Sequence, residues 1–336
     1  MKKKYILLII LLLMIAVTYS FFFSSNVNVQ EGKKYLYIRT GSNYEYLIQE
    51  IKDSQLIENI STFKLVASLF SLSQNIHPGR YELKNGMGNY SIIKMLKQGH
   101  QTPVNLVINK LRTKQDIIKK FSSQLEADKS QWEKLFLDSL FLAKNDIDSN
   151  QIQILILPNT YQVYWNTKPE KVMDKFITYK NKFWNETRIN KAKNLNLTPN
   201  QVSIIASIVD EETNKNDEKP MVASVYINRY RKGMKLEADP TVKFAVGDFS
   251  LRRILNIHLK TASPYNTYLN TGLPPGPICT PSEKSIDAVL DAKETNYLFF
   301  CAKEDFSGYH NFASTYSEHL TNAKKFQNAL NQRGIK

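Results

Sequence analysis

The chain has 336 residues, which is longer than one average domain and predicts two or three folded units behind a leader. Lys and Arg number 45 against 31 Asp and Glu, and the formal net charge of +14 is typical of proteins that meet an anionic partner. The sequence has no nucleic-acid module, such as an aromatic-basic strand signature or paired Cys/His spacing. We therefore favour a solvated basic surface over nucleic-acid binding.

The first apolar segment covers residues 5–23, YILLIILLLMIAVTYSFFF, which contain no charge and are long enough to cross a bilayer. A cleavable signal peptide is the alternative, but it would have a shorter apolar core and a small-x-small cleavage site. We expect an uncleaved transmembrane helix after a cytoplasmic tail of residues 1–4. The three lysines of that tail place it inside by the positive-inside rule. A single-pass protein of the inner (cytoplasmic) membrane follows, with its bulk on the extracytoplasmic side.

Residues 24–33 are small and polar and are predicted to form a tether. Residues 34–102 then follow the order strand, helix, helix, strand. The strands are expected at 34–40 and 79–83, the helices near 46–51 and 61–72, and a further helix at 91–97 ends at Gly99. This order resembles the small glycan-binding LysM module, and the likeness is architectural only.

Residues 103–336 mix helices and strands, so the expected fold class is α+β with a mixed α/β domain after the LysM-like subdomain. Strands are predicted at 104–108, 152–157, 297–302 and 308–313, and the second of these is a short, buried apolar run that leads into a loop. Helices are predicted at 113–125, within 127–150, at 169–184, from 199 onward, and from a capping box at Thr315 to Leu330.

Only two cysteines occur, Cys279 and Cys301, and they are either a disulfide pair of an oxidising compartment or, as we favour, two buried free thiols. The five histidines form no HExxH or Cys-x-x-Cys pattern. We therefore expect neither a metal site nor a cofactor.

The segment TPNQVSIIASIVDEET predicts a helix, because Thr198 and Gln201 have capping-box spacing and Pro199 suits the first helical position. Apolar residues define one broad face of this helix, and Glu212 lies near the centre of that face. Burial there would raise the pKa of Glu212 and keep it protonated as a general acid near neutral pH. The alternative is that Glu212 only ends the helix and pairs with Arg229 or Arg231. For its neighbours Asp210 and Glu211 we expect a solvated surface.

Three polar, turn-rich strings follow, at residues 237–241, 263–268 and 271–278. Amide, hydroxyl and aromatic groups on ordered loops bind sugars through hydrogen bonds and ring stacking. The alternative is that their prolines and glycines merely shape surface turns.

Five motifs in order carry a family resemblance: ASIVDEET at 206–213, VASVYINR at 222–229, DPT at 239–241, YNTY at 265–268 and GLPPGPI at 272–278. Together they closely resemble the YceG-like endolytic murein transglycosylases, from about Val104 to the C-terminus. The anchor and the LysM-like unit also suit that family.

The resemblance places the family's catalytic glutamate on Glu212, the residue that helical geometry also selects. It implies a substrate-binding set made of Tyr265, Asn266, Thr267, Asp239, Thr241, Tyr161 and His310. Two departures occur: Asp210 stands where relatives have glutamate, and Asn159 stands where they have aspartate. Because Asn159 is uncharged, we treat its loop as structural or substrate-lining.

The resemblance implies cleavage of the β-1,4 bond between N-acetylmuramic acid and N-acetylglucosamine in peptidoglycan strands, with a 1,6-anhydro end and termination of nascent strands. The expected partners are the glycan strand, the bilayer and peptidoglycan synthases, without nucleic acid. Two alternatives stay open. A lysozyme-like hydrolase would need a second carboxylate, for which Asp239 is the candidate. A non-catalytic glycan-binding scaffold would not need Glu212.

Overall fold

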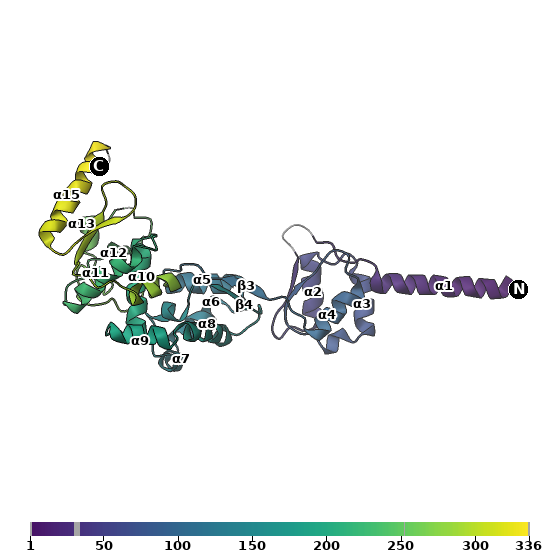
Figure 1. Cartoon of the computed structure of the whole chain (residues 1–336). Coiled ribbons are helices and arrows are strands. Elements are labelled where there is room, and N and C mark those ends of the chain that lie inside the picture. The colour runs from purple at the N-terminus through teal and green to yellow at the C-terminus, as the bar shows by residue number, and fades with distance from the viewer. Residues whose placement is uncertain (1, 30–33, 252, 335–336) are drawn as a thin grey trace. The chain divides into compact units, whose positions relative to one another are not determined.

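The computed structural model describes residues 2–29, 34–251 and 253–334 (Figure 1). The chain forms two compact units. Unit 1 comprises Met1–Leu106, Phe121–Asp128 and Gln162–Lys168. Unit 2 comprises Val107–Lys120, Lys129–Tyr161 and Pro169–Lys336.

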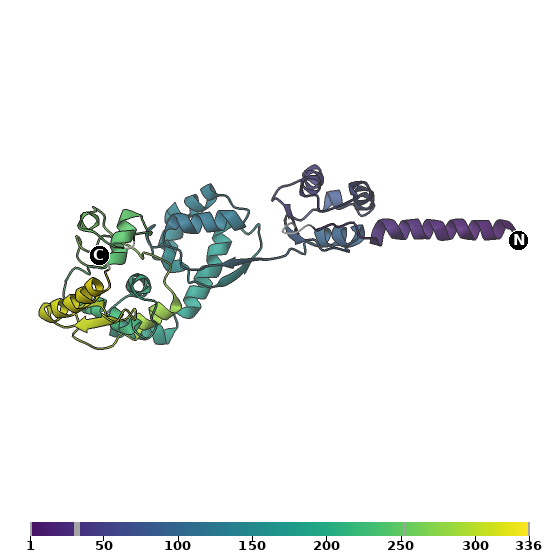
Figure 2. The same ribbon diagram turned by 90° about the horizontal axis from the view of Figure 1, so that it is seen from above.

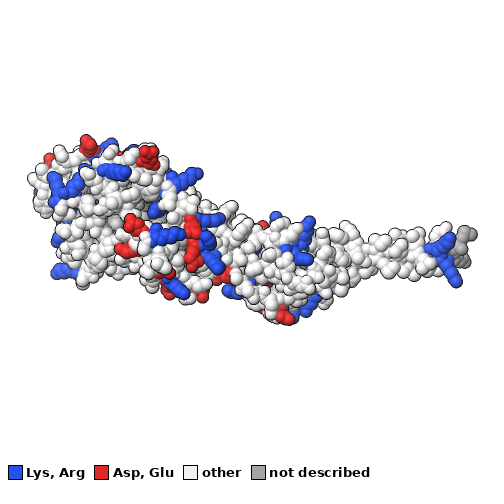
Figure 3. Space-filling view, turned by 90° about the horizontal axis from the view of Figure 1, so that it is seen from below, with Lys and Arg blue, Asp and Glu red and all other residues white. Residues whose placement is uncertain are grey.

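Unit 1 begins with the long apolar helix α1 (Lys2–Phe23). Within the described residues, the segment Lys3–Phe23 is the one helical stretch long and apolar enough to cross a membrane. On the face shown in Figure 3, α1 has charged side chains only at its N-terminal end. The elements that follow are β1 (Tyr35–Ile38), α2 (Tyr44–Ser54), α3 (Ile60–Leu69), η1 (Leu72–Gln74), β2 (Gly79–Glu82) and α4 (Asn89–Gln98).

The strand–helix–helix–strand order of unit 1 follows from local signals. Asn43 and Asn59 accept hydrogen bonds from the first turns of α2 and α3, and Gly99 ends α4 in the left-handed conformation. Strands β1 and β2 pair antiparallel from Tyr35 opposite Glu82 to Ile38 opposite Gly79. Alternate residues of β1 enter the core, which the helices cover.

The segment expected as a tether is folded onto unit 1 as far as the structure describes it. Val27 is buried and bridges Ile57, while the Asn26 side chain donates to Asn89 Oδ1 (2.6 Å). The polar composition suggested a free linker, but asparagine amides also satisfy backbone groups inside a fold. Residues 30–33 lie outside the described part.

Strands β3 (Val104–Val107) and β4 (Thr160–Val163) pair with each other. Unit 2 is mainly helical. Its helices are α5 (Lys114–Gln124, which runs into unit 1), α6 (Lys129–Leu137), α7 (Ser139–Lys144), α8 (Pro169–Phe183), α9 (Glu186–Asn194), α10 (Pro199–Glu212), α11 (Lys219–Arg231), α12 (Asp239–Val246), α13 (Asn256–Leu259), α14 (Glu283–Leu290) and α15 (Tyr316–Gln332).

One expected strand is wrong: the apolar run 152–157 begins with the 3-10 helix η2 (Ile152–Leu155). All four residues of η2 are buried, and a short buried apolar run has no periodicity that separates strand from helix. The expected pair of C-terminal strands is confirmed as the antiparallel hairpin β5 (Phe299–Ala302) and β6 (His310–Ala313). Helix α15 packs along this hairpin (Figure 2).

Helix α10 forms the centre of unit 2 and contacts α9, α11, α12 and α14. Every residue from Val202 to Asp210 is buried, so α10 is enclosed on all sides and not on one face alone. The whole chain is thus α+β, with an N-terminal helix suited to a membrane anchor.

Candidate active site

The end of α10 carries Glu212, the last residue of the helix. The start of α10 is fixed by the expected capping box, in which Thr198 accepts from Gln201 N and the Gln201 side chain accepts from Thr198 N. The buried body of the helix then sets the direction of its C-terminus. Glu212 itself is only partly buried.

Glu212 lines a pocket of about 280 Å³ in unit 2. The wall combines acidic, basic, aromatic and apolar side chains from six parts of the chain. Beside Glu212 these are Val225, Tyr226, Arg229, Leu236, Glu237, Asp239, Tyr268, Leu298, Phe299, Phe300, Tyr316 and His319. A carboxyl group among rings is a suitable setting for acid–base chemistry on a bound sugar.

The Tyr226 hydroxyl donates a hydrogen bond to Glu212 Oε1. Burial raises the pKa of Glu212 to about 7; the Tyr226 hydrogen bond and Lys243 lower it, while the charges of Asp239 and Glu211 raise it. The carboxyl group is therefore partly protonated at neutral pH, so it can both release and accept a proton.

Asp239 also lines the pocket, and of the expected substrate-binding residues it alone does so. It is the first residue of α12, where Pro240 follows, and its Oδ1 accepts a hydrogen bond from the Tyr268 hydroxyl (2.7 Å).

Asp210 is buried, and the expectation of a solvated side chain is wrong. Its carboxylate accepts from Lys219 Nζ (2.7 Å) and from the Ser282 backbone N–H (3.0 Å), and Lys219 also donates to Ser285 Oγ (2.8 Å). Burial would raise the pKa of Asp210, but the Lys219 hydrogen bond and nearby positive charges outweigh it and hold the pKa below its usual range.

Glu211 is partly buried rather than solvated, and forms ion pairs with Arg112 (3.0 Å) and Lys110 (3.4 Å). Arg229 does not pair with Glu212, contrary to the alternative considered from sequence. Its guanidinium donates to the carbonyls of Leu298 and Leu236 and to Glu237 Oε2. Arg229 thereby joins α11 to the β5 hairpin and shapes the pocket wall.

Three residues of the expected binding set are fully enclosed behind the pocket. Asn266 is 0% exposed, donates to the carbonyls of Leu259 and Thr261, and accepts from Tyr268 N. Thr241 and Thr267 share a hydrogen bond of 2.8 Å. These groups fix the loop that holds Tyr268, and none of the three lines the pocket.

The other three residues of that set lie elsewhere in unit 2. Tyr265 packs on Phe244 with ring centroids 4.5 Å apart. Tyr161 is buried and donates to Leu157 O (2.7 Å). His310 Nδ1 lies 2.8 Å from Glu218 Oε2. The structure thus brings together Glu212 and Asp239 alone of the eight expected residues.

The sequence interpretation did not single out Tyr226 and Tyr268, the two hydroxyl partners of the pocket carboxylates. Both lie in the motifs that carry the family resemblance. The sequence alone does not distinguish a tyrosine that packs in the core from one whose hydroxyl donates a hydrogen bond. The spacing of Val222, Ala223 and Tyr226 on α11 places Tyr226 on the buried face, which was the available clue.

Cys279 is buried, Cys301 is partly buried, and both are free thiols. Within the described ranges, no group of three or more His, Cys, Asp and Glu side chains could hold a metal ion.

Comparisons with known proteins give a consistent family. The YceG-like family model matches residues 36–325. The endolytic murein transglycosylase of Bacillus subtilis (strain 168) is 28% identical over 317 residues, covering 88% of this chain and 85% of that protein. The endolytic murein transglycosylase of Streptococcus pneumoniae serotype 2 (strain D39) is 26% identical over 302 residues, and this chain spans about half (54%) of its length.

A solved structure agrees with the sequence relatives. The crystal structure of a YceG-like protein from Listeria monocytogenes has a TM-score of 0.56 and 26% identity, covering 85% of this chain and 97% of that one. The match to the family model covers most of the chain and includes both units. The chain belongs to the YceG-like family.

Proposed function

We propose that this chain is an endolytic murein transglycosylase that cuts the β-1,4 bond between N-acetylmuramic acid and N-acetylglucosamine within glycan strands and ends nascent strands. The observation that carries the proposal is Glu212, a carboxyl group of pKa about 7 in the pocket wall, in a chain whose relatives bear that name.

In the proposed reaction, Glu212 acts twice. Its protonated form gives a proton to the glycosidic oxygen, and the bond to C1 of the muramic acid breaks. The resulting carboxylate then takes the proton of the C6 hydroxyl as that oxygen closes on C1. The Tyr226 hydrogen bond stabilises the carboxylate between the two steps. No water enters, and the product has a 1,6-anhydro end.

A second candidate is lysozyme-like hydrolysis, and the observation that favours it is Asp239 in the same pocket wall. A hydrolase uses a second carboxylate as a nucleophile or to activate water. In this structure Asp239 is engaged by the Tyr268 hydroxyl, which suits a fixed negative charge beside the sugar.

The experiment that tests the role of Glu212 compares Glu212→Gln with Glu211→Gln on purified glycan strands. Glutamine keeps the shape of glutamate but cannot transfer the proton, so cutting should fall at least about 10² to 10⁴-fold in Glu212→Gln. Glu211→Gln, with the same change one residue earlier, should retain appreciable activity. Cutting by Glu212→Gln at the wild-type rate would refute the proposal.

We further propose that α1 anchors the protein in the inner membrane by one pass, with residues 1–4 in the cytoplasm and both units outside. The support is the length and apolarity of α1 and the lysines at its N-terminal end. Peptidoglycan synthases working at the same membrane surface are the proposed protein partners.

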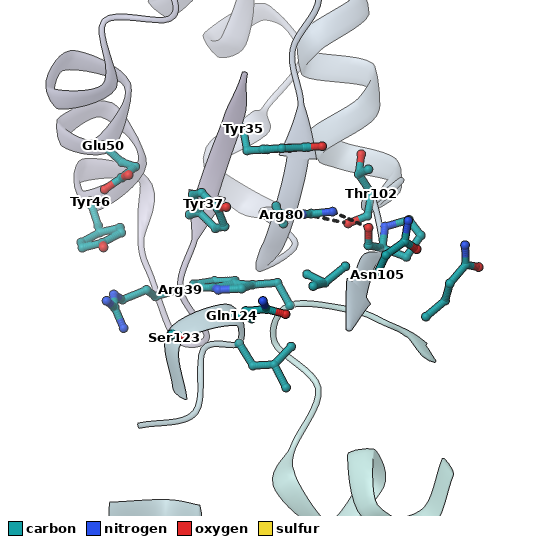
Figure 4. Close-up of a pocket in the computed structure, with 15 residues that line it drawn as sticks. Tyr35, Tyr37, Arg39, Tyr46, Glu50, Arg80, Thr102, Asn105, Ser123 and Gln124 are labelled. Carbon is teal, nitrogen blue, oxygen red and sulfur yellow. Dashed lines mark hydrogen bonds between the residues drawn. The ribbon is translucent and has the colours of Figure 1, made fainter. Parts of the chain in front are cut away.

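Residues 34–102 are proposed as a LysM-like glycan-binding subdomain before a catalytic region of residues 103–336. The support is the β1–α2–α3–β2 order and an open cavity of about 880 Å³ in unit 1, to which residues 34–102 contribute Tyr35, Tyr37 and Arg80. Later residues of unit 1, among them Gln162 and Trp165, complete the lining. Figure 4 shows Tyr35 and Tyr37 of β1 beside Arg80 of β2 at this cavity. The rings of Tyr37 and Trp165 meet at 5.0 Å. Aromatic faces among polar groups suit sugar rings.

Sedimentation with peptidoglycan sacculi tests this subdomain in a full-length Glu212→Gln background, where cutting does not interfere. Tyr37→Ala should reduce the bound fraction several-fold. Tyr164→Ala is the control, because Tyr164 is exposed in unit 1 but does not line the cavity. Equal binding by the two variants would reject the glycan site.

A further inference from the structure

Helix α1 enters unit 1 through a tight joint with α4. The Asn89 side chain donates to Phe21 O (2.9 Å), and Asn26 N donates to Met87 O (2.9 Å). A Cβ at Gly88 would lie 2.8 Å from backbone atoms of Phe22 and Phe23, so a larger residue would not fit there. The end of α1 is therefore fixed against α4 and not joined to it by a free linker.

Aromatic side chains surround this joint. Phe22 meets Phe70 at 6.0 Å, Phe23 meets Tyr90 at 5.7 Å, and Phe70 meets Tyr90 at 5.4 Å between ring centroids. The 22 residues of α1 span about 33 Å at the helical rise, slightly more than a hydrocarbon core of about 30 Å. With α1 across a bilayer, these rings lie at the level of the lipid headgroups, where aromatic residues are enriched.

A groove of about 240 Å³ lies between Phe70 and α4, which contributes Tyr90, Ile93, Lys94, Lys97 and Gln98 to its lining. Its floor is apolar and its rim carries two ammonium groups. Lys97 Nζ donates to Phe70 O (2.7 Å), while Lys94 is exposed. On α3, Leu65 and Leu69 are 50% and 65% exposed although they are large and apolar.

The chain segment that forms the groove is mostly basic in its charged residues. Between Asn59 and Gln115 the sequence has a single acidic residue, Glu82, and Glu82 forms an ion pair with Lys34. Lysines beside a bilayer surface are attracted to anionic lipids. Apolar groups that would be unfavourable in water become favourable in the interfacial region.

We propose that this groove binds an anionic phospholipid of the leaflet from which α1 emerges. The acyl chain packs on Phe70, Tyr90 and Ile93, and the phosphate lies against Lys94. Bound in this way, α3 and α4 rest on the bilayer with Leu65 and Leu69 inserted at the interface. The proposal rests on α1 spanning the membrane and does not depend on the chemistry of Glu212.

Quenching by lipids with brominated acyl chains tests this contact in the full-length protein reconstituted into vesicles. Leu69→Trp places a probe on α3, and Leu140→Trp, on a leucine 81% exposed in α7 of unit 2, is the matched control. The three native tryptophans give the same background in both. In vesicles containing phosphatidylglycerol we expect at least twofold more quenching for Leu69→Trp. Equal quenching in the two variants would overturn the proposal.

The lipid class is tested in the same Leu69→Trp protein. We expect quenching to fall at least twofold in pure phosphatidylcholine, and to fall similarly on adding Lys94→Glu in the anionic vesicles. Lys52→Glu, the same charge change on an exposed residue of α2, should leave the signal unchanged. Quenching that is equal in neutral and anionic vesicles would overturn the assignment to an anionic lipid. All outcomes can be read in Glu212→Gln protein, so failure here is separate from failure of the proposed enzyme activity.

Discussion

At the scale of single residues, the surroundings of Glu212 set its pKa through opposing effects. Burial raises the pKa most, and the Tyr226 hydroxyl opposes it by stabilising the charged form. The resulting value near 7 leaves both protonation states accessible at neutral pH. A single carboxyl group with this property can serve an acid step and then a base step.

Removal of the Tyr226 hydroxyl should raise the pKa of Glu212. We expect the alkaline limb of the kcat/KM profile of Tyr226→Phe to move to higher pH, with a rate lower by up to about tenfold near pH 7, since a hydrogen bond to a charged group is lost. Tyr230→Phe is the control on the same helix, because the Tyr230 hydroxyl accepts from Gln201 instead. An alkaline limb that moves to lower pH, or does not move, would contradict this assignment.

The same pKa predicts how Glu212 affects stability. Its folded value of about 7 exceeds the ordinary 4.5, so its favourable contribution is present below pH 4.5 and is lost as pH rises through 7. The glutamine of Glu212→Gln does not ionise, so this variant does not lose stability in the same way as pH rises. Its free energy of unfolding should equal that of wild type near pH 4 and exceed it by about 3 kcal/mol near pH 8. Urea unfolding at both pH values measures the difference, and a gap independent of pH would refute the explanation.

At the scale of secondary-structure elements, the buried pair of Asp210 and Lys219 links α10 to α11, and Ser282 and Ser285 extend the link to α14. Loss of one partner leaves an unpaired buried charge. Lys219→Met should therefore reduce the free energy of unfolding by about 3 to 5 kcal/mol.

The double variant Asp210→Asn/Lys219→Met should be more stable than the sum of the single effects, because neither charge is left unpaired. Asp291→Asn removes the exposed pair with Lys191 and should change stability by less than about 1 kcal/mol. Additive effects at Asp210 and Lys219 would show that the two side chains do not act as a pair.

The loop that holds Tyr268 depends on Asn266. Asn266→Ala removes hydrogen bonds to two backbone carbonyls and should lower the free energy of unfolding by about 1 to 3 kcal/mol. If the Asn266 side chain served only to bind sugar, its removal would not lower the free energy of unfolding. Asn214→Ala, on an exposed residue, is the control. Unchanged stability in Asn266→Ala would mean that the loop does not need these bonds.

Helix ends were predicted well where neighbouring residues in the sequence carry a capping signal. The capping boxes at Thr198 and Thr315 and the glycine after α4 mark helix ends that the structure confirms. The burial of Asp210 was not predictable, since its partners are Lys219 of α11 and Ser282, which caps the start of α14. The same holds for the internal hydrogen bond between Thr241 and Thr267. Polar residues in a turn-rich string look alike whether they face a ligand or the core.

At the scale of the whole molecule, the two units have different proposed tasks. Unit 1 carries the apolar helix, the lysine-rimmed groove and the aromatic cavity, and unit 2 carries the pocket of Glu212. The net charge of +14 is compatible with the proposed contact between unit 1 and anionic lipids. An anchored enzyme of this kind would meet glycan strands close to the membrane.

The mass of the products from a defined glycan strand tests the central claim most directly. If Glu212 acts as both acid and base without water, the fragments ending in muramic acid should be lighter by one water than hydrolytic fragments and should resist borohydride reduction. Full-mass fragments with reducible ends would show hydrolysis and contradict the proposed mechanism.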